Sequence, residues 1–429
     1  MLDLIIRGAT LPDGRENIDI GIAGERIAAV EPNLQSEALQ IIEAHGRLVT
    51  PPFVDAHIHL DSALSLGLPR MNQSGTLLEG IALWGELKPD LTAQAIYERA
   101  KKLCLWSMAR GTLGIRSHVD ICDDRLLSVE ALVHLREEMR PYIDIQLVAF
   151  PQDGFFRYAN SAQNLERALD MGVDVVGGIP HFERSTEDGT YSVKALMSLA
   201  ADRGLLVDMH CDETDDPNSR HIETLAAETI RHGMGGRVTG SHLTSMHSMD
   251  NYYVSKLIPL IAEAGVAAIA NPLINITLQG RHDTYPKRHG MTRVKELLAA
   301  GVNVGFGHDC VMDPWYSFGS HDMLEVASMG LHVGQLTGVE DVKACFAAVT
   351  ENPAKILGLD GYGIAPGCHA DLVVLQAADA FEAIRIFAER LYVIRRGKIL
   401  AQAAPRQSQV WFGGQAVAVD FTRAGFEQL

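Results

Sequence analysis

The feature that most constrains the fold is an alternation of short apolar runs with amphipathic helical stretches between about residue 48 and residue 310. Eight of these runs are typical of buried strands, and eight is the number that a closed parallel barrel needs. Glycines at the ends of several helical stretches support the division, because glycine adopts the left-handed conformation that ends a helix at least cost. The pattern predicts an α/β protein built on a (β/α)8 TIM barrel, with strands at residues 48–60, 114–120, 144–150, 173–180, 205–212, 237–243, 267–272 and 303–310.

The two ends of the chain carry a different pattern. Residues 1–50 hold short alternating segments broken by turn signals, and similar segments return at residues 370–375 and 391–400. Because one or two isolated hairpins are only marginally stable in water, we expect the two ends to pair into one small β-sandwich. The predicted domains are residues 1–53 (first part of the sandwich), 54–364 (barrel) and 365–429 (second part of the sandwich).

Composition restricts the partners. The formal net charge of −17 argues against nucleic acid or an anionic membrane, because phosphate groups would be repelled. The six cysteines lie far apart with no Cys-x-x-Cys spacing, which favours neither a disulfide framework nor a zinc knuckle and fits a reducing compartment. The first residues lack the build of a signal peptide, and no apolar run reaches membrane-spanning length. We therefore expect a cytoplasmic protein that acts on a small molecule.

Ligand-type side chains stand where several predicted strands end. His57 and His59 are two residues apart in one strand and therefore face the same way. His210, His242 and Asp309 lie at the ends of the fifth, sixth and eighth strands, and in such a barrel the carboxyl ends of the strands carry the chemistry. Packing explains five such residues poorly. Three imidazoles and a carboxylate, from His57, His59, His210 and Asp309, make a suitable metal site with room for a water, and His242 lies beside it.

A metal held in this way would lower the pKa of a water molecule toward neutrality and so provide a nucleophile. The free oxygen of Asp309 could then take up the proton and pass it to a leaving group. Glu213 follows His210 by three residues, so it lies just past the strand end and can reach into the mouth of the site.

The sequence resembles the amidohydrolase superfamily, and within it the bacterial cytosine deaminase branch very closely. The resemblance covers almost the whole chain. The motifs that carry it are residues 51–59 (PPFVDAHIH), 72–77 (NQSGTL), 148–152 (VAFPQ), 210–213 (HCDE), 275–281 (NITLQGR), 283–288 (DTYPKR), 306–309 (FGHD) and 313–316 (DPWY).

The resemblance implies roles for the site residues. The four predicted metal ligands match those of one divalent ion, Fe²⁺ or Zn²⁺. Glu213 matches the acid that faces the ring nitrogen beside the reacting carbon, and His242 matches the imidazole that orients the water on the metal. Gln152 matches the side chain that recognises the amide edge of the pyrimidine. Trp315 matches an aromatic wall of the pocket, and Leu77 lies in a segment that supplies backbone contacts to the ring.

The implied activity is the metal-dependent hydrolytic deamination of cytosine or a 5-substituted cytosine such as 5-methylcytosine, which releases ammonia and the corresponding uracil or thymine, in a homo-oligomer. Two-metal members of the superfamily carry a carboxylated lysine on the fourth strand, and residues 173–183 contain no lysine. The unrelated zinc nucleobase deaminases carry Pro-Cys-x-x-Cys, which is absent here. Isocytosine, isoguanine, creatinine and amino-triazines stay open as substrates, and a catalytically inactive scaffold is the alternative of another class.

One residue departs from the cytosine deaminase pattern. Directly after Asp309 that pattern has a second aspartate, and here the residue is Cys310. A protonated cysteine is smaller, uncharged and weakly apolar. The resemblance places this side chain beside the part of the ring next to the amino-bearing carbon, so we expect it to make room for a methyl group there. Neutral drift at this position is the alternative interpretation.

Overall fold

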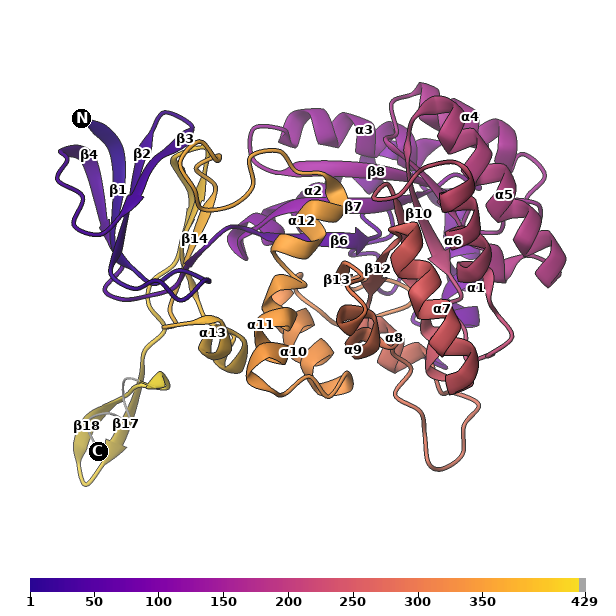
Figure 1. Cartoon of the computed structure of the whole chain (residues 1–429). Helices are drawn as coiled ribbons and strands as arrows, with labels where there is room; N and C mark the ends of the chain where they lie inside the picture. The colour runs from indigo at the N-terminus through magenta and orange to yellow at the C-terminus, as the bar shows by residue number, and fades with distance from the viewer. Residues whose placement is uncertain (424–429) are drawn as a thin grey trace.

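The computed structural model describes residues 1–423 and consists of a large helix-rich body beside a smaller β body (Figure 1). In the smaller body, strands from the beginning of the chain, drawn in indigo, lie next to strands from its end, drawn in yellow. Within the described residues, no helix is both long enough and apolar enough to cross a membrane.

The large body is a parallel barrel. Its sheet has the order β13-β12-β11-β10-β9-β8-β7-β6, with every neighbouring pair parallel. A parallel bridge between Ile58 and Asp309 joins the last strand to the first and closes the ring. The predicted (β/α)8 barrel is therefore confirmed. Its strands are β6 (Phe53–Ile58), β7 (Thr112–Asp120), β8 (Asp144–Phe150), β9 (Val175–Gly178), β10 (Leu206–Cys211), β11 (Val238–His242), β12 (Ala267–Ala270) and β13 (Val304–Phe306).

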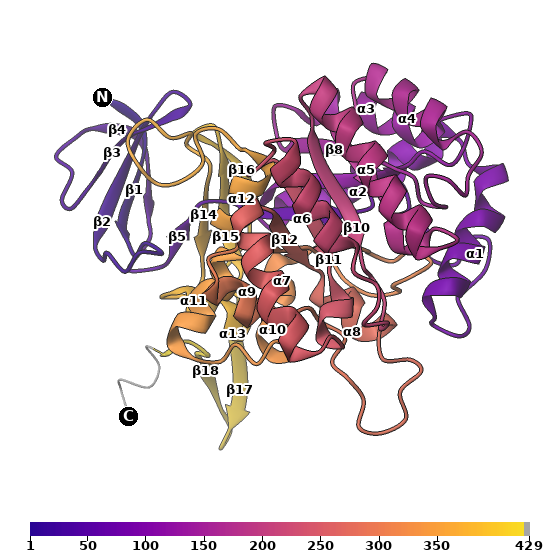
Figure 2. The ribbon, with the colours of Figure 1, turned by 45° about the vertical axis from the view of Figure 1, so that its right-hand side comes forward.

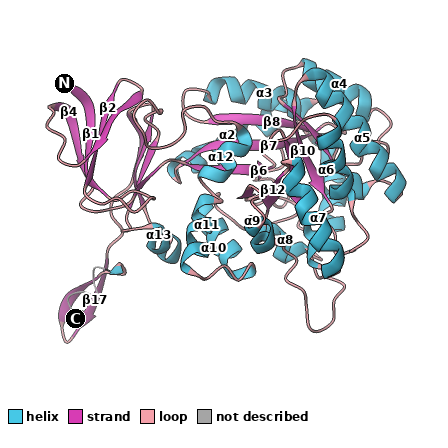
Figure 3. Ribbon diagram, viewed as in Figure 1, coloured by secondary structure: helices cyan, strands magenta, loops and turns pink. Residues whose placement is uncertain are grey.

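Helices surround this barrel, as the cyan ribbons around the magenta strands show (Figure 3). All nine residues of β7 are buried, because one face of the strand packs inside the barrel and the other against helices. The helices are α1 (Leu77–Leu87), α2 (Ala93–Ala109), α3 (Leu127–Met139), α4 (Ser161–Asp170), α5 (Thr186–Arg203), α6 (His221–Arg231), α7 (Asn251–Ala264), α8 (Pro272–Leu278), α9 (Val294–Ala299), α10 (Met323–Val333), α11 (Val339–Ala347) and α12 (Glu351–Leu357). As predicted, α5 and α7 end at glycines with positive φ, Gly204 (66°) and Gly265 (65°).

The first and last predicted strands are shorter in the structure. The run from residue 48 to residue 60 is divided by Pro51 and Pro52, which have no backbone N–H to donate to a sheet. Residues before the prolines form β5 (Val49–Thr50), which belongs to the smaller body, and residues after them form β6. Asp309 lies three residues beyond the end of β13, in the loop that follows the strand.

The smaller body contains two four-stranded sheets. One has the order β3-β2-β1-β4 and the other β16-β15-β14-β5, so the second combines strands from both parts of the chain. Buried side chains of both sheets, such as Ile20, Val49 and Leu372, share one apolar cluster. The domain boundaries after residues 53 and 364 stay a prediction. The strands are β1 (Leu2–Ala9), β2 (Ile18–Ala23), β3 (Arg26–Glu31), β4 (Ala38–Glu43), β14 (Leu372–Leu375), β15 (Arg390–Arg395) and β16 (Lys398–Gln402).

A buried arginine joins the two bodies. Arg390 of β15 is 1% exposed, and its Nη1 donates to Oδ2 of Asp322 at 3.1 Å. Its Nε donates to the carbonyl oxygen of Arg110 at 3.0 Å, and its guanidinium lies 5.1 Å from the centre of the Phe53 ring. Asp322 in turn caps the N-terminus of α10. A buried ion pair between Arg390 and Asp322 therefore connects the sandwich to the barrel.

The described chain ends in an arm. Helix α13 (Ala380–Ile386) lies between β14 and β15 in the chain. After β16, the strands β17 (Ser408–Phe412) and β18 (Gln415–Val419) form a two-stranded sheet of their own. Both views show this hairpin projecting from the molecule (Figures 1 and 2). The sequence predicts that residues 365–429 belong to the sandwich. Of these, residues 424–429 lie outside the described residues, and β17 and β18 pair with no other described strand.

Candidate functional site

The predicted metal ligands meet at the carboxyl end of the barrel. Ligand atoms of His57, His59, His210 and Asp309 all lie within 4.8 Å of one another. Nε2 of His59 is 3.1 Å from Nε2 of His210, and Oδ1 of Asp309 is 3.4 Å from Nε2 of His59 and 3.6 Å from Nε2 of His57. Four residues in or just after the strands β6, β10 and β13 thus converge on one point, and all four are buried.

This cluster fits a divalent transition metal. Both ring nitrogens of the fully buried His57, and Nδ1 of His210, have no hydrogen-bond partner among the residues that the structure describes. A buried polar group without a partner lowers the stability of the fold by about 1 to 3 kcal/mol, and a bound metal ion would provide these nitrogens with a partner. Imidazole nitrogens together with one carboxylate are the donor set that Zn²⁺ and Fe²⁺ take in proteins.

Asp55 holds two of the ligand-bearing segments together. Its Oδ1 accepts hydrogen bonds from the backbone nitrogens of His57 at 3.0 Å and His308 at 3.2 Å, and its Oδ2 lies 2.8 Å from Nε2 of His321. The carboxylate therefore fixes the end of β6 against the segment that carries Asp309. No role of Asp55 is predicted from the sequence, although an aspartate inside an apolar, buried strand is a signal that its carboxylate has polar partners.

Two of the site residues have a left-handed backbone. His242 has a φ of 71° and Asp309 a φ of 68°. A residue with a β-carbon seldom adopts this region, and the cost is of order 1 to 3 kcal/mol at each position. At each of these two positions the backbone turns sharply after the strand, and the turns bring the side chains of His242 and Asp309 close together.

His242 lies between two carboxyl groups. Its Nδ1 is 3.5 Å from Oε1 of Glu213, and its Nε2 is 3.7 Å from Oδ2 of Asp309. The side-chain amides of Asn271 and Asn275 hold the ring from the other side, with Nδ2 of Asn275 3.1 Å from Nδ1. Nδ2 of Asn271 also lies 3.4 Å from Nε2, so the two amides contact both ring nitrogens. Neither asparagine is predicted from the sequence as part of the site, although Asn275 lies inside the motif at residues 275–281.

A cavity of about 220 Å³ opens beside the cluster. Its wall includes Leu77, Gln152, Glu213, Cys310 and Trp315, so the predicted catalytic and binding side chains lie around one space. Of the predicted ligands, His57 is the one that does not line the cavity, because it is completely buried behind the others. The sequence did not indicate the apolar part of the wall, which consists of Leu78, Ile81, Ile179, Phe182, Ile274 and Leu278.

Helix α1 and Trp315 fit closely together. A β-carbon on Gly80 would lie 2.4 Å from Cδ1 of Trp315, so glycine is needed at this helix position. Trp84, one turn further along, lies 6.1 Å from the Trp315 ring and donates from Nε1 to Oδ2 of Asp120 at 2.8 Å. Lys88, just after the helix, pairs with the same carboxylate at 2.8 Å. The wall that carries Leu77 is thereby fastened to the end of β7.

Burial sets the charge state of the groups around the cavity. Removal from water, followed by the negative charge of Asp309, raises the pKa of Glu213 well above its usual range. Burial, followed by the charges of Asp313 and Asp309, likewise raises the pKa of the Cys310 thiol. Burial raises the pKa of Asp313 to about 6. Cys310 therefore presents a neutral thiol to the cavity, with its Sγ 3.6 Å from Oδ1 of Asp309.

Comparisons with known proteins agree with this architecture. A crystal structure of 5-methylcytosine deaminase from Klebsiella pneumoniae, liganded with phosphonocytosine, is 42% identical in sequence and superposes with a TM-score of 0.91 over 94% of this chain and 99% of that one. N-isopropylammelide isopropyl amidohydrolase from Pseudomonas sp. (strain ADP) is 32% identical over 411 residues, which is 93% of this chain and 97% of that protein.

Pterin deaminase from Rhizobium rhizogenes (strain K84) is 30% identical over 399 residues, 92% of this chain and 90% of that protein. The model of the amidohydrolase family matches residues 40–418. The chain therefore belongs to the amidohydrolase family, as a metal-dependent, cytosine-deaminase-like hydrolase that acts on C–N bonds of cyclic amidines.

Proposed function

We propose that the protein removes the amino group of a cytosine-type base by hydrolysis and prefers 5-methylcytosine to cytosine. Water supplies the oxygen, the C–N bond breaks, and the products are ammonia with thymine or uracil. The observation that carries the proposal is the cavity itself, because three of the four predicted ligands border the same space as Gln152, Glu213 and the neutral Cys310. The resemblance to a 5-methylcytosine deaminase over nearly the whole chain supports the same substrate class.

We assign one metal ion, Fe²⁺ or Zn²⁺, to His57, His59, His210 and Asp309. When bound, such an ion lowers the pKa of a water molecule toward neutrality. A second group of possible ligands, His57 with His118 and Asp208, is less suitable, because Nη1 of Arg116 already pairs with Asp208 at 2.9 Å. The single ion also agrees with the absence of lysine from residues 173–183.

The protein side chains then divide the work of positioning and proton transfer. The carboxamide of Gln152 binds the amide edge of the ring, and Trp315 and the segment at Leu77 hold its faces and rim. Glu213 gives a proton to the ring nitrogen next to the reacting carbon, which makes that carbon more electrophilic. His242 orients the attacking water. Asp309 takes one proton from that water and delivers it to the departing amine. The proton left on the new hydroxyl group returns to Glu213 as the C–N bond breaks.

The volume of about 220 Å³ suits a small heterocycle with one short substituent. The apolar wall and the thiol of Cys310 offer contacts to a methyl group, whereas the polar end offers the hydrogen bonds that a pyrimidine needs. A scaffold without activity is less well supported, because such a protein would be expected to have lost ligands, whereas all four ligand-type residues are present and lie together. The absence of a disulfide-type cysteine pattern supports a cytoplasmic location.

The test is an ammonia-release assay on the metal-loaded protein with cytosine, 5-methylcytosine, isocytosine, isoguanine, creatinine and amino-triazines, each compared by kcat/KM. We expect 5-methylcytosine to be the best substrate and cytosine the second. His210→Ala, which removes one predicted ligand, is the matched control and should be inactive. Turnover of a triazine or a purine with none of the two cytosines would refute the proposed substrate class.

A further inference from the structure

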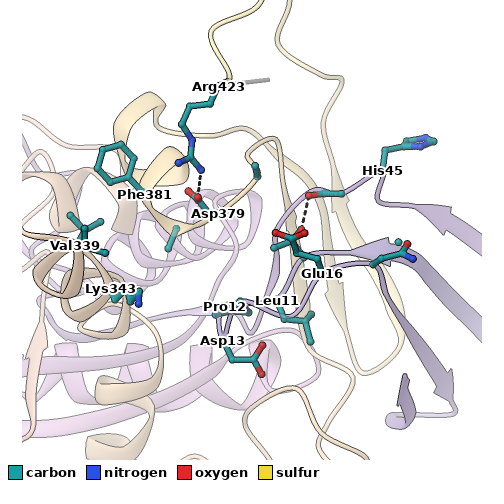
Figure 4. A pocket seen from close by; sticks show the side chains of 18 of the residues that line it. Leu11, Pro12, Asp13, Glu16, His45, Val339, Lys343, Asp379, Phe381 and Arg423 are labelled. Carbon is teal, nitrogen blue, oxygen red and sulfur yellow. Dashed lines mark hydrogen bonds and ion pairs between the residues drawn. The ribbon is translucent and has the colours of Figure 1, made fainter. Parts of the chain in front are cut away.

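Two sequence motifs, residues 72–77 and 275–281, meet beside the cavity at the carboxyl ends of the barrel strands. A groove of about 1260 Å³ between the loop after β1 and the helices α11 and α13 is larger (Figure 4), but it shares no lining residue with that cavity. One cation of the groove, Arg423, already pairs with Asp379. The contact between the two motifs is therefore the feature that can bear on the reaction.

The first of these motifs leads into helix α1, which forms one wall of the cavity. Leu77 and Leu78 are the first two residues of the helix, and both line the cavity. Their backbone N–H groups have no hydrogen-bond partner among the described residues, as is usual in the first turn of a helix. In the proposed function this segment meets the rim of the base, so these N–H groups can donate to an oxygen of the ring. Their position then depends on what holds residues 72–76.

Asn72 connects this segment to the aromatic wall of the cavity. Its Oδ1 accepts a hydrogen bond from the backbone nitrogen of Gly75 at 2.8 Å. Its Nδ2 donates to the carbonyl oxygens of Pro314 at 3.0 Å and Thr76 at 3.2 Å. Since Pro314 directly precedes Trp315, which lines the cavity, Asn72 fixes the start of α1 relative to this aromatic side chain.

Arg281 connects the same segment to a second wall. Its Nη2 donates to the carbonyl oxygen of Gly75 at 2.9 Å, and its Nε donates to the carbonyl oxygen of Thr277, near the end of α8, at 2.7 Å. Gly75 has a φ of 64°, and a β-carbon on it would lie 3.4 Å from Nη2, so the two residues fit closely. One guanidinium therefore joins the start of α1 to the helix whose Ile274 and Leu278 line the cavity.

The loop that carries Arg281 is itself anchored. The backbone nitrogen of Gly280 donates to Oδ2 of Asp215 at 2.8 Å. Asp215 follows Glu213 by two residues in the segment after β10. Arg281 is therefore held at its own end, and it can fix the position of residues 75–77 instead of following it.

We propose that Arg281 and Asn72 are positioning residues of the deaminase reaction, which hold the N–H groups of Leu77 and Leu78 where the base docks. This role rests on the proposed function, in which the base occupies the cavity. A hydrogen bond to the rim of the ring is made in the ground state and in the transition state alike, so its loss raises KM and leaves kcat nearly unchanged. A displacement of about 1 Å can cost up to about 10²-fold, so we expect KM to rise by about 10- to 100-fold.

The experiment compares the steady-state kinetics of the metal-loaded wild type with those of Arg281→Met, Asn72→Ala and a control, Arg184→Met. Arg184 is an exposed arginine between β9 and α5 that pairs with no described side chain. We expect Arg281→Met and Asn72→Ala each to raise the KM of the best substrate by about 10- to 100-fold, with kcat and metal content close to those of the wild type. The control should change neither constant. An unchanged KM, or a kcat that falls as much as kcat/KM does, overturns the proposal.

The double variant, Arg281→Met with Asn72→Ala, tests whether both residues act through one segment. Once either contact is lost the segment is no longer held, so we expect the KM of the double variant to lie close to that of the more affected single variant. Independent contributions would multiply instead. A rise in KM equal to the product of the two single rises therefore contradicts a shared action.

A second measurement needs no substrate. Hydrogen exchange of the protein without a base, followed by mass spectrometry, should become faster in residues 72–78 of Arg281→Met and Asn72→Ala, while exchange in the barrel strands and the melting temperature stay as in the wild type. Unchanged exchange in residues 72–78, or faster exchange throughout the chain, overturns the proposal. Failure of the proposed function shows differently, as a wild type that turns over neither cytosine nor 5-methylcytosine.

Discussion

Replacement of Cys310 by aspartate tests how the cavity selects its base. The thiol is 4% exposed, lines the cavity and lies 3.6 Å from Oδ1 of Asp309. Its pKa is raised, by burial first and then by the charges of Asp313 and Asp309, so the native side chain is uncharged. On the proposed placement of the base, we expect a methyl group on the ring carbon next to the amino-bearing one to meet an apolar contact in the native protein and a carboxyl group in the variant.

The magnitude follows from the methyl group. One methyl in a fitted pocket is worth about 1 to 3 kcal/mol, or roughly 10- to 200-fold in kcat/KM. We expect the wild type to prefer 5-methylcytosine over cytosine by that factor. In Cys310→Asp the methyl would have to desolvate a polar group, and the preference should reverse toward cytosine. The new carboxyl group also stands near Asp309 and Asp313, and two like charges 4 Å apart repel by about 4 kcal/mol at an effective dielectric of 20, so absolute rates should fall for both bases.

The assay is therefore the ratio of kcat/KM for the two bases, because losses common to both substrates cancel in it. Metal content is measured in parallel and should be unchanged, since Asp309 is untouched. Cys310→Ser is the matched control: it keeps the size and neutrality of the side chain and should give a ratio between those of the wild type and the aspartate variant. A wild type that prefers cytosine, or a ratio that Cys310→Asp leaves unchanged, would refute the reasoning and leave neutral drift as the better explanation.

Three further predictions concern the metal, the acid and the joint between the two bodies. Metal analysis should give one equivalent per chain, with chelation abolishing activity; two equivalents, or full activity of the chelated protein, would contradict the single site. Glu213→Gln should keep its metal and lose about 10²-fold or more in kcat, the usual scale for a general acid, whereas near-normal turnover would remove Glu213 from the mechanism. Arg390→Met should lower the free energy of unfolding by about 3 to 5 kcal/mol in denaturant titrations at neutral pH, because it leaves Asp322 buried and unpaired. Burial opposes ionisation of Asp322, but the charge of Arg390 outweighs this effect and lowers the pKa of Asp322. The stabilisation by the pair is therefore present at neutral pH and is lost as the pH falls below about 4. The stabilities of the wild type and Arg390→Met should converge in acid, and an equal difference at pH 3 and pH 7 would count against the pair.

The sequence predicted the barrel and the convergence of its ligands because both depend on local rules. Strand periodicity and helix-ending glycines mark each element, and the carboxyl ends of parallel strands must meet at one face. The apolar wall of the cavity was not predicted, because residues such as Ile81 and Phe182 are ordinary apolar residues until the fold places them beside one another. Nor was the backbone of His242 and Asp309, whose left-handed conformation is imposed by the surrounding structure against the local preference of both residues.

The same distinction applies to Asp55 and Asn275. Each makes its contacts with residues that are distant in the sequence, Asp55 with His308 and Asn275 with His242. No pattern of spacing reveals such a contact. The divided first strand was different, because Pro51 and Pro52 were visible in the sequence and exclude a continuous ladder through both residues.

The pairing of β5 with β14 makes assembly of the smaller body wait for the end of synthesis. Thr50 and Val373 are partners in one sheet, yet the ribosome adds Val373 about 320 residues later, roughly 15 to 60 seconds at ordinary elongation rates. During that time the first sheet has no partner for its apolar face, and all eight barrel strands are made before Val373 is added. The nascent chain therefore carries an uncovered hydrophobic sheet at its leading end, a natural point of attachment for a chaperone and for misassembly with a neighbouring nascent chain.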